Sequence, residues 1–578
     1  MMLRFLFTAS AVAATLVSLP ASAAGARNTR LKITVQSTTS VSAAASAAPA
    51  IAALAADADV RRDDQREARH AAMVQKLALQ RASKMSAALL ASAPRTLPRL
   101  PGGLRLGEGD EPGGFAGLSN VDQSSVNYGY SVEPPDQALC AGNGYLFEGV
   151  NDAFSVFSEG GKRVAGPAQA NAFFRLPFAI NVSDPKCLYD AATDRWFVTM
   201  IAYDNTLTNT AVMIAVSQSG DPTGSFIVYQ LDTSNDGSDF FPGDCPCLGD
   251  QPLIGLDANG FYISTNAFGT YSFQGAQVYA ISKAALARGD TTVGAVHFDQ
   301  LSYQLPDVEF SYSIQPAFNP PGAKGEAGTE YLAQSMRALT LENRLAVWAI
   351  RDTTALDGDP STMTMSSVVI PSQTYAQPVP ATQKDGPTPL AENDRLIAPE
   401  QPIDGNDQRL SQVMYLNGQL WTAVGTAAVS PGTPVRDAIG WFVINVASPG
   451  GVLQASVAAQ GYIAGPGSSH LVYPAVAVNS HGEAAMVFTL TGTHYYPSAA
   501  TWSFGSRSIQ VLADGAAPQD GFSAYYYNRP RWGDYSAASV GSDGSIWMAT
   551  EMIPGGPRRR AANWGTFIGR SRHHGEDD

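Results

Sequence analysis

From residue 135 onward, short apolar runs alternate with tight turns rich in Gly, Asn and Asp. Each copy of this pattern has an entry residue, a short apolar run, a turn, and a second run that often carries an aromatic residue. The copies begin at Pro135, Ser183, Asp250, Ser313, Arg409, Tyr473 and Gly533. Their turns are residues 142–144, 192–194, 258–260, 417–418, 480–482 and 543–544, and the fourth copy has a longer loop at 319–328. Because Gly accepts positive φ and Asn or Asp caps a turn, each copy predicts a β-hairpin.

The regular return of this hairpin predicts an all-β repeat fold. The copies recur about every sixty residues, longer than the ~40–50 residues of compact propeller repeats, so we expect long loops. Seven copies predict a seven-bladed β-propeller of four-stranded antiparallel blades, because a ring of blades protects its strand edges. Residues 563–570 are the expected closing strand, and the Pro-rich insert at 371–406 is expected on the surface. The alternative, two β-sandwiches in series, would not share one unit along the whole body.

The first hundred residues lack the repeat. Arg4, an apolar run at residues 5–19 and the sequence Ala21-Ser22-Ala23 predict a signal peptide cleaved after Ala23, and hence a secreted or periplasmic protein. Residues 24–114 are Ala-rich, with helical spacing at 66–90, and form either a propeptide or, as we favour, a poorly ordered spacer. The predicted domains are residues 1–23 (signal peptide), 24–114 (partly helical or disordered segment), 115–570 (propeller) and 571–578 (disordered tail).

Composition and charge narrow the class of partner. The chain holds 54 Gly and 37 Pro with only 15% charged residues, which is typical of a turn-rich β protein. Residues 1–100 carry 13 Lys and Arg against 5 Asp and Glu, whereas the remaining residues carry 24 against 46, a net charge of −22. Because residues 101–578 are so acidic, they would repel nucleic acid and anionic lipid, which are therefore disfavoured as partners. No later segment is apolar enough to span a membrane, and we expect a monomer.

Four cysteines are present: Cys140, Cys187, Cys245 and Cys247. An even number in an exported protein favours disulfides over a metal site, and three pairings are open. Cys140 and Cys187 follow Asp136 and Asp184 at similar offsets, which suggests a bridge between neighbouring blades.

The residues at which the inner strands begin are the candidate ligand-binding residues. They are Asp136, Asp184, Asp250, Gln315, Arg409, Tyr473, Arg531 and Asp534. If the strand register holds, three or four carboxylates meet at one mouth of the ring. Such a cluster would either have raised pKa values or bind a hard cation such as Ca²⁺. The candidate ligands of that cation are Asp136, Asp184 and Asp250. The structural alternative is that each Asp caps the turn that enters its own strand.

The body also resembles a known class of propeller. Residues 542–547 (SDGSIW) resemble a contracted Asp box, and residues 217–226 (SQSGDPTGSF) resemble a degenerate one. Together with SDPKCLYDAATDRWF and RWGDYSAASV, these stretches make residues 115–570 similar to uncharacterised exported bacterial propellers of the sialidase-like, Asp-box class. The resemblance implies the propeller fold and leaves the activity open.

One short motif points to sialidase chemistry. The sequence Phe174-Arg175-Leu176-Pro177 resembles the sialidase motif whose Arg clamps the substrate carboxylate. That resemblance would make Arg175 part of an arginine triad with Arg531 and Arg409. A tyrosine, Tyr535 or Tyr473, would then be the nucleophile beside a carboxylate such as Asp534.

The sequence therefore favours an exported propeller that binds a carbohydrate or a peptide at an acidic central funnel, with or without catalysis. The alternatives are a glycoside-cleaving enzyme of sialidase-like type and an envelope protein that docks another protein. No G-x-S-x-G, H-E-x-x-H or C-x-x-C-H motif indicates another chemistry. The aromatic run at residues 525–527 precedes the last funnel entry and is suited to stacking on a sugar or peptide.

Overall fold

The computed structural model describes residues 27–52, 96–100, 102–107, 113–129, 131–234, 243–301, 310–336, 341–389, 402–521, 523, 530–556 and 562–571. The predicted signal peptide, the predicted helix at 66–90, the aromatic run at 525–527 and all but the first residue of the predicted tail lie outside these residues.

Most of the described chain consists of successive antiparallel units. In each unit, every strand pairs with the next strand along the chain. The first two units consist of β4 (Ala138–Gly142), β5 (Tyr145–Val150), β6 (Ala153–Ser158) and β7 (Arg163–Gln169), and of β8 (Asn181–Asp190), β9 (Arg195–Tyr203), β10 (Thr210–Ser217) and β11 (Phe226–Asp232). The next three consist of β12 (Leu248–Leu256), β13 (Gly260–Phe268), β14 (Phe273–Ser282) and β15 (Thr292–Asp299); of β16 (Gln315–Phe318), β17 (Thr329–Ser335), β18 (Glu342–Arg351) and β19 (Thr364–Tyr375); and of β20 (Val413–Leu416), β21 (Gln419–Ala428), β22 (Arg436–Ala447) and β23 (Gln454–Ile463). The last two consist of β24 (His470–Val478), β25 (Ala484–Gly492), β26 (Tyr495–Ser503) and β27 (Ser508–Ala513), and of β28 (Ala537–Val540), β29 (Ile546–Met552) and β30 (Gly565–Ser571).

Each predicted turn lies between the first and second strands of a unit. The turn at residues 142–144 joins β4 to β5, for example, with Asn143 at φ 49° and Gly144 at φ 80°. The turn at residues 543–544 joins β28 to β29, where Gly544 has φ 82° and the Asp543 side chain accepts from the backbone N–H of Ser545. The sequence pattern therefore located these hairpins correctly.

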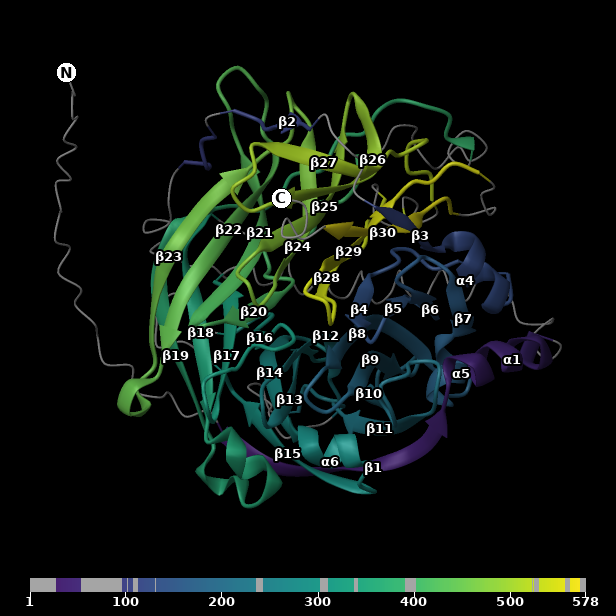
Figure 1. Ribbon diagram of the computed structural model, residues 1–578, viewed down its shortest axis with the longest axis vertical. Helices are drawn as coiled ribbons and strands as arrows, with labels where there is room; N and C mark the ends of the chain where they lie inside the picture. The colour runs from purple at the N-terminus through teal and green to yellow at the C-terminus, as the bar shows by residue number, and fades with distance from the viewer. Residues whose placement is uncertain are drawn as a thin grey trace.

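The units form a closed ring. The first strands contact one another in order, β4 with β8, then β12, β16, β20, β24 and β28, and β28 contacts β4 again. Figure 1 shows the units arranged around a common centre, with these strands nearest to it. The protein is thus mainly β and has the radial arrangement of a β-propeller.

The ring closes through a strand from the opposite end of the sequence. β3 (Gly114–Ser119) pairs antiparallel with β30, so the last unit combines three C-terminal strands with one N-terminal strand. The predicted closing strand at 563–570 corresponds to β30, and β3 lies outside it. This pairing joins residues more than 440 positions apart, which no local pattern reveals.

The sequence predicts a separate four-stranded sheet for every unit, but the hydrogen bonding separates only some of them. Strands β4 to β7 form one such sheet, and β28 to β30 form another with β3. Parallel pairings of β12 with β16 and of β16 with β20 connect neighbouring units at their inner edges. At the outer edge, β1 (Arg27–Thr39) connects the β8–β11 unit to the β12–β15 unit, so β1 and the strands from β8 to β23 form one continuous sheet of seventeen strands. The short strand β2 (Arg105–Leu106) pairs in parallel with β27.

The N-terminal strand β1 corrects our interpretation of residues 24–114 as a poorly ordered spacer. Its first half pairs with β15 and its second half with β11, so it crosses the outer edges of two adjacent units (Figure 1). The alternation of Leu31, Ile33 and Val35 with polar residues is a strand pattern, and Ile33 is buried. The helix α1 (Val41–Ala52) follows and packs against β7.

The remaining helices are short. They are α4 (Asn120–Val126), α5 (Ala170–Phe174), α6 (Lys283–Arg288) and the 3₁₀ turns η1 (Thr353–Asp357), η2 (Pro360–Thr362) and η3 (Pro449–Gly451). Within the part of the chain that is described, no helix has the length and apolar character needed to cross a membrane.

The hydrophobic core lies between adjacent units. Phe147 of β5 contacts Phe154 of β6, Phe173 of α5 and Phe226 of β11, with ring centroids 5.5 Å, 6.3 Å and 6.2 Å away. Each of these rings is fully buried, which contributes about 1.5–3 kcal/mol per side chain. The Phe147–Phe226 contact therefore joins the β4–β7 unit to the β8–β11 unit.

Both disulfides that the sequence favours are present. Cys140 of β4 is bonded to Cys187 of β8, with 5.6 Å between their Cα atoms, so the predicted bridge between neighbouring units is confirmed. Cys245 is bonded to Cys247, only two positions away. All four cysteines lie in the described residues and all are paired.

The insert at residues 371–406 is not simply a surface loop. Ala381 and Ile403 form an isolated antiparallel bridge and are fully buried, packed with Val472, Tyr473 and Trp532 at one end of the ring. The apolar side chains in this Pro-rich stretch explain the difference, because they cover the ends of the inner strands.

Candidate functional site

The inner strands begin with an unusual backbone conformation. Asp136, Asp184 and Tyr473 have φ values of 38°, 59° and 56°, in the left-handed region that non-glycine residues rarely adopt. The strand register shifts at the latter two positions, between Ser183 and Lys186 and between Val472 and Ala475. Such conformations cost on the order of 1–3 kcal/mol each and persist only where the surroundings impose them.

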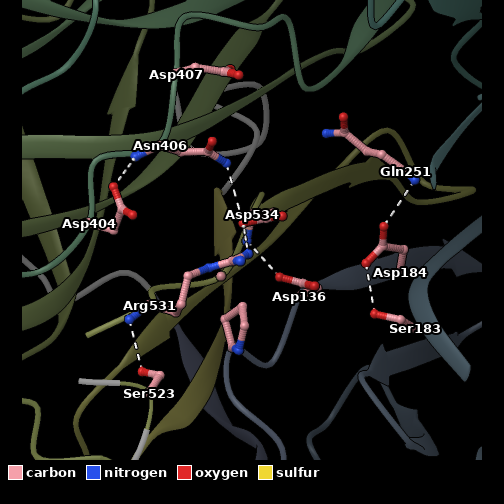
Figure 2. A network of polar contacts seen from close by, with 12 residues as sticks. Asp136, Ser183, Asp184, Gln251, Asp404, Asn406, Asp407, Ser523, Arg531 and Asp534 are labelled. Atoms are coloured by element: carbon pink, nitrogen blue, oxygen red, sulfur yellow. Dashed lines mark hydrogen bonds and ion pairs between the residues drawn. The ribbon is translucent and has the colours of Figure 1, made fainter. Parts of the chain in front are cut away.

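The surrounding contacts link one unit to the next. The Asp136 carboxylate accepts hydrogen bonds from the backbone N–H of Asp534 at 2.6 Å and from the Asn151 side chain at 2.8 Å. The Asn151 side-chain oxygen accepts from the backbone N–H of Asp184 at 2.8 Å. The Asp184 carboxylate in turn accepts from the backbone N–H of Gln251 at 3.1 Å, as Figure 2 shows.

A neutral pair continues the same pattern in the next units. The side-chain oxygen of Asn266 accepts from the backbone N–H of Ser313 at 2.8 Å, and its amide donates to Gln251 at 3.3 Å. These entry side chains therefore cap backbone N–H groups of neighbouring units. For Asp136 and Asp184, the prediction that the carboxylate caps a backbone N–H group is correct, but the group belongs to a neighbouring unit and not to the residue's own turn.

Two arginines occupy this end of the ring. Arg409 forms a bidentate ion pair with Asp407, at 2.7 Å for both bonds, and its guanidinium lies over the ring of Tyr312. Arg409 also donates to the side chain of Gln251. With an exposed side-chain fraction of 11%, Arg409 is largely enclosed by these partners.

The second arginine is more open. Arg531 pairs with Asp534 at 2.5 Å, and the two side chains remain 22% and 23% exposed. The Asn406 amide donates to the same Asp534 oxygen at 3.3 Å (Figure 2). This pair is the part of the network that a ligand can reach most readily.

Lys186 lies among the carboxylates. Its ammonium is placed over the ring of Tyr535, and burial lowers its pKa to about 7 even though Asp184, Asp136 and Asp534 act in the opposite direction. Burial, together with the charges of Asp534 and Asp184, raises the pKa of Asp136 well above its usual value. The cluster therefore contains both a carboxyl group and an amine whose protonation is shifted toward the neutral form.

A small cavity lies along the inner strands next to this cluster. It has a volume of about 40 Å³, enough for a water molecule or two. Its polar lining residues are Gln137, Lys186, Gln315, Ser411, Gln412 and Ser536. Gln315, one of the predicted site residues, donates its amide to the backbone oxygens of Ile254 and Pro316 at 3.1 Å and 2.8 Å.

The structure brings most of the predicted residues together. Asp136, Asp184, Arg409, Arg531 and Asp534 belong to one network of contacts and charges. The remaining predicted residues at this end are Tyr473, Tyr535 and Asp250. Tyr473 is buried and donates its hydroxyl to the backbone oxygen of Asp404 at 3.0 Å. The Tyr535 hydroxyl donates to the backbone oxygen of Pro185 at 3.1 Å. Asp250 is near enough to Tyr535 to raise the pKa of its hydroxyl. In the β12–β15 unit, Gln251 rather than Asp250 takes the left-handed position, with φ 50°.

Arg175 lies elsewhere. It follows α5 with φ 58°, and its side chain donates to the backbone oxygen of Thr38 in β1 at 3.3 Å. It therefore contacts the strand at the outer edge of the ring instead of the inner-strand entries. The arginine triad that the Phe-Arg-Leu-Pro motif suggested does not assemble with Arg409 and Arg531.

Several members of the network were missed in the sequence. Asn151 and Asn266 each lie at the end of a second strand, and the shared stretches Asn-Asp-Ala-Phe and Asn-Ala-Phe could have indicated a common role. Lys186 lies between Asp184 and Cys187, for which the sequence predicted roles, but no role was predicted for the lysine itself. Asp404 and Asn406 come from the insert and Asp407 directly follows it, and only the packed structure places them here.

The carboxylates do not form a metal centre among the residues that the structure describes. There, no group of three His, Cys, Asp or Glu side chains is placed to hold one ion. The carboxylate oxygens of Asp136 are instead occupied by N–H donors.

Comparison with known proteins gives likeness of fold alone. No family model matches the chain, and no curated protein matches its sequence. Among solved structures, an exo-β-1,3-galactanase from Clostridium thermocellum is 11% identical over 69% of this chain and 82% of its own, with a TM-score of 0.29. A Trypanosoma rangeli sialidase is 9% identical over 72% and 57%, with a TM-score of 0.32, and a Dyadobacter fermentans protein of unknown function is 10% identical over 68% and 96%, with a TM-score of 0.33. At these values the likenesses carry no argument about activity.

Proposed function

We propose that this protein is an exported, seven-bladed β-propeller that binds a polar ligand, a carbohydrate or a peptide, at the entry of its inner strands. The observation that carries the proposal is the Arg531–Asp534 ion pair. Each side chain is about one fifth exposed, while Asp136 and Ser523, which accept hydrogen bonds from the backbone N–H groups of Asp534 and Arg531, are buried. A pre-organised donor and acceptor that face solvent side by side suit a ligand with hydroxyl, amide or ammonium groups.

The charge of the cluster supports the same class of ligand. The cluster has more acidic than basic side chains: five carboxyl groups, of Asp136, Asp184, Asp404, Asp407 and Asp534, lie with three basic groups, of Lys186, Arg409 and Arg531. An anionic ligand would meet repulsion there, whereas a neutral sugar or a basic peptide would not. Two disulfides support export, because such bonds persist in oxidising compartments.

We favour binding over glycoside cleavage. Both oxygens of Asp136 accept hydrogen bonds from the framework, and the side chain is 2% exposed, so this carboxyl group has a structural role and little access to a ligand. Arg175, which the sialidase resemblance would use to clamp a carboxylate, contacts Thr38 instead. The remaining alternative, an envelope protein that docks a partner, would use the same surface with a peptide segment as ligand.

The test uses the purified mature protein on glycan and peptide arrays, with affinities measured by calorimetry for any ligand found. Arg531→Gln should weaken binding at least about tenfold, because a charge-assisted bond contributes on the order of 1.5–3 kcal/mol. The matched control is Arg570→Gln, which breaks the exposed Arg570–Asp543 ion pair at the other end of β28. Equal binding by both variants, or no glycan or peptide bound at all, would refute the proposal.

A further inference from the structure

The Cys245–Cys247 disulfide has little to contribute to folding. It closes a loop between residues two positions apart, with 4.4 Å between the Cα atoms, whereas Cys140–Cys187 spans 47 positions. Because the entropy removed from the unfolded chain grows with loop length, so short a loop gives little stabilisation. A disulfide that contributes so little to stability is a candidate for a chemical role.

Cys245 and Cys247 differ in their exposure to solvent. Cys245 is partly exposed and the neighbouring Pro246 is exposed, whereas Cys247 is fully buried. Cys247 is held by its backbone, which donates to Ser234 at 2.5 Å and accepts from the Thr210 hydroxyl at 2.6 Å. An incoming thiol can therefore reach one side of the bond while the other side stays protected. In the other disulfide, both cysteines are buried, at 0% and 6% exposure.

An exposed aromatic residue is fixed beside this disulfide. Tyr271, in the loop between β13 and β14, is 77% exposed, the most open large apolar side chain among the described residues. Asp244, immediately before Cys245, accepts from the backbone N–H of Tyr271 at 2.7 Å and of Ser272 at 2.9 Å, and from the Gln274 amide at 2.9 Å. The backbone oxygen of Asp244 also accepts from Thr270 at 2.9 Å. One buried carboxylate thus ties the aromatic loop to the residue next to the reachable cysteine.

We propose that Cys245–Cys247 is a thiol–disulfide exchange site for dithiols of exported polypeptides, with Tyr271 as a docking residue for the polypeptide. A substrate thiol loses its proton to solvent and attacks Sγ of Cys245, which breaks the bond to Cys247 and forms a mixed disulfide. The Cys247 thiolate leaves and takes a proton from solvent. The second substrate thiolate then attacks the substrate sulfur, releases Cys245 as a thiolate and leaves the substrate as a disulfide, so that two electrons have passed from the substrate to the protein. This activity does not depend on the proposed ligand binding.

The first experiment uses the folded protein and its second disulfide as an internal reference. The protein is incubated with reduced and oxidised glutathione in varied ratios, quenched with an alkylating agent and digested for mass spectrometry. Cys245–Cys247 should exchange at least about 100-fold faster than Cys140–Cys187, because access governs the rate. Equal rates for the two disulfides, or a Cys245–Cys247 bond that resists glutathione in the folded protein, would overturn the proposal.

Single-cysteine variants test which sulfur is attacked. Cys247→Ser should form a mixed disulfide with glutathione at Cys245, whereas Cys245→Ser, with its remaining thiol buried, should form it at least about tenfold more slowly. Circular dichroism establishes that both variants are folded. Adducts formed equally fast on both variants, or on neither, would contradict the assignment of Cys245.

Tyr271→Ala separates an exchange site for polypeptides from a merely accessible disulfide. The variant should oxidise a reduced dithiol peptide several-fold more slowly than the parent protein, while its rate with glutathione stays unchanged. Equal loss with both thiols, or no loss with the peptide, would remove Tyr271 and the polypeptide substrate from the proposal.

Discussion

The carboxylate of Asp136 accepts a hydrogen bond from the backbone N–H of Asp534, 398 positions later in the chain, at 2.6 Å. The bond joins the first and last units of the ring at the end where the candidate ligand site lies. It gives the entry carboxylates a framework role, and the variants below separate that role from ligand binding.

Asp136→Asn should lower the free energy of unfolding by about 1–2 kcal/mol near pH 7. Both oxygens of Asp136 accept N–H groups, so the amide of an asparagine must face one of these donors. Asn151 cannot turn to compensate, because its own amide donates to the oxygen of Pro134 and its oxygen accepts from Asp184. Urea denaturation measures the change.

Asp221→Asn is the control for that variant. Asp221 is an exposed turn residue between β10 and β11 and accepts only within its own loop. Its substitution should change stability by less than about 0.5 kcal/mol. If Asp136→Asn were as stable as the parent or more so, repulsion among the carboxylates would outweigh the framework bonds.

Lys186 should make stability depend on pH in the alkaline range. Its pKa is about 7 in the folded protein and near 10.5 in the unfolded chain, so the unfolded state binds more protons between these values. Stability should therefore rise as the pH increases from 7 toward 10, by up to about 1.4 kcal/mol per pH unit. The free energy of unfolding is compared with that of Lys186→Met over the same pH range, because the contributions of the other titrating groups are shared by both proteins and cancel in the difference. Parallel pH curves for the two proteins would show that the Lys186 amine does not titrate in this window.

The N-terminal strands β1 and β3 should differ in how much they contribute to folding. Deletion of residues 24–52 removes β1 and α1 and exposes the outer edges of β11 and β15, so the protein should fold with reduced stability. Deletion through Ser119 also removes β3, which completes the last unit, and should abolish a cooperative thermal transition. Circular dichroism melts and size-exclusion chromatography distinguish the two. A cooperative melt in the longer deletion would mean that the ring closes without β3.

The two disulfides should contribute unequally to stability. Replacement of Cys140 and Cys187 by Ala should cost about 2–4 kcal/mol, since their bond closes a long loop between two units. The same replacement of Cys245 and Cys247 should cost about 1.5 kcal/mol or less, because the loop that this bond closes is so short. Denaturation of both double variants under non-reducing conditions provides the measurement. Similar losses in both would show that the short bridge also supports the fold.

The sequence by itself determined the local structure of this protein. Turns such as Asn143-Gly144 and Asp543-Gly544 fix positive φ at positions that the amino-acid type dictates, so the hairpins and their repeat could be predicted. The same repeat placed Asp136, Asp184 and Asp534 at equivalent strand entries, and the matching offsets of Cys140 and Cys187 indicated their bond.

Only the tertiary structure decided which distant segments meet. The pairing of β3 with β30, the position of β1 across two units, and the contacts that Asp404 and Asn406 of the insert make with Tyr473 and Asp534 all depend on packing between segments far apart in the sequence. It also decided that Arg175 faces Thr38 instead of Arg531, although the short motif around it suggested a shared site. A turn is specified by the few residues that form it, whereas a site at a ring's centre is specified by how all the units close around it.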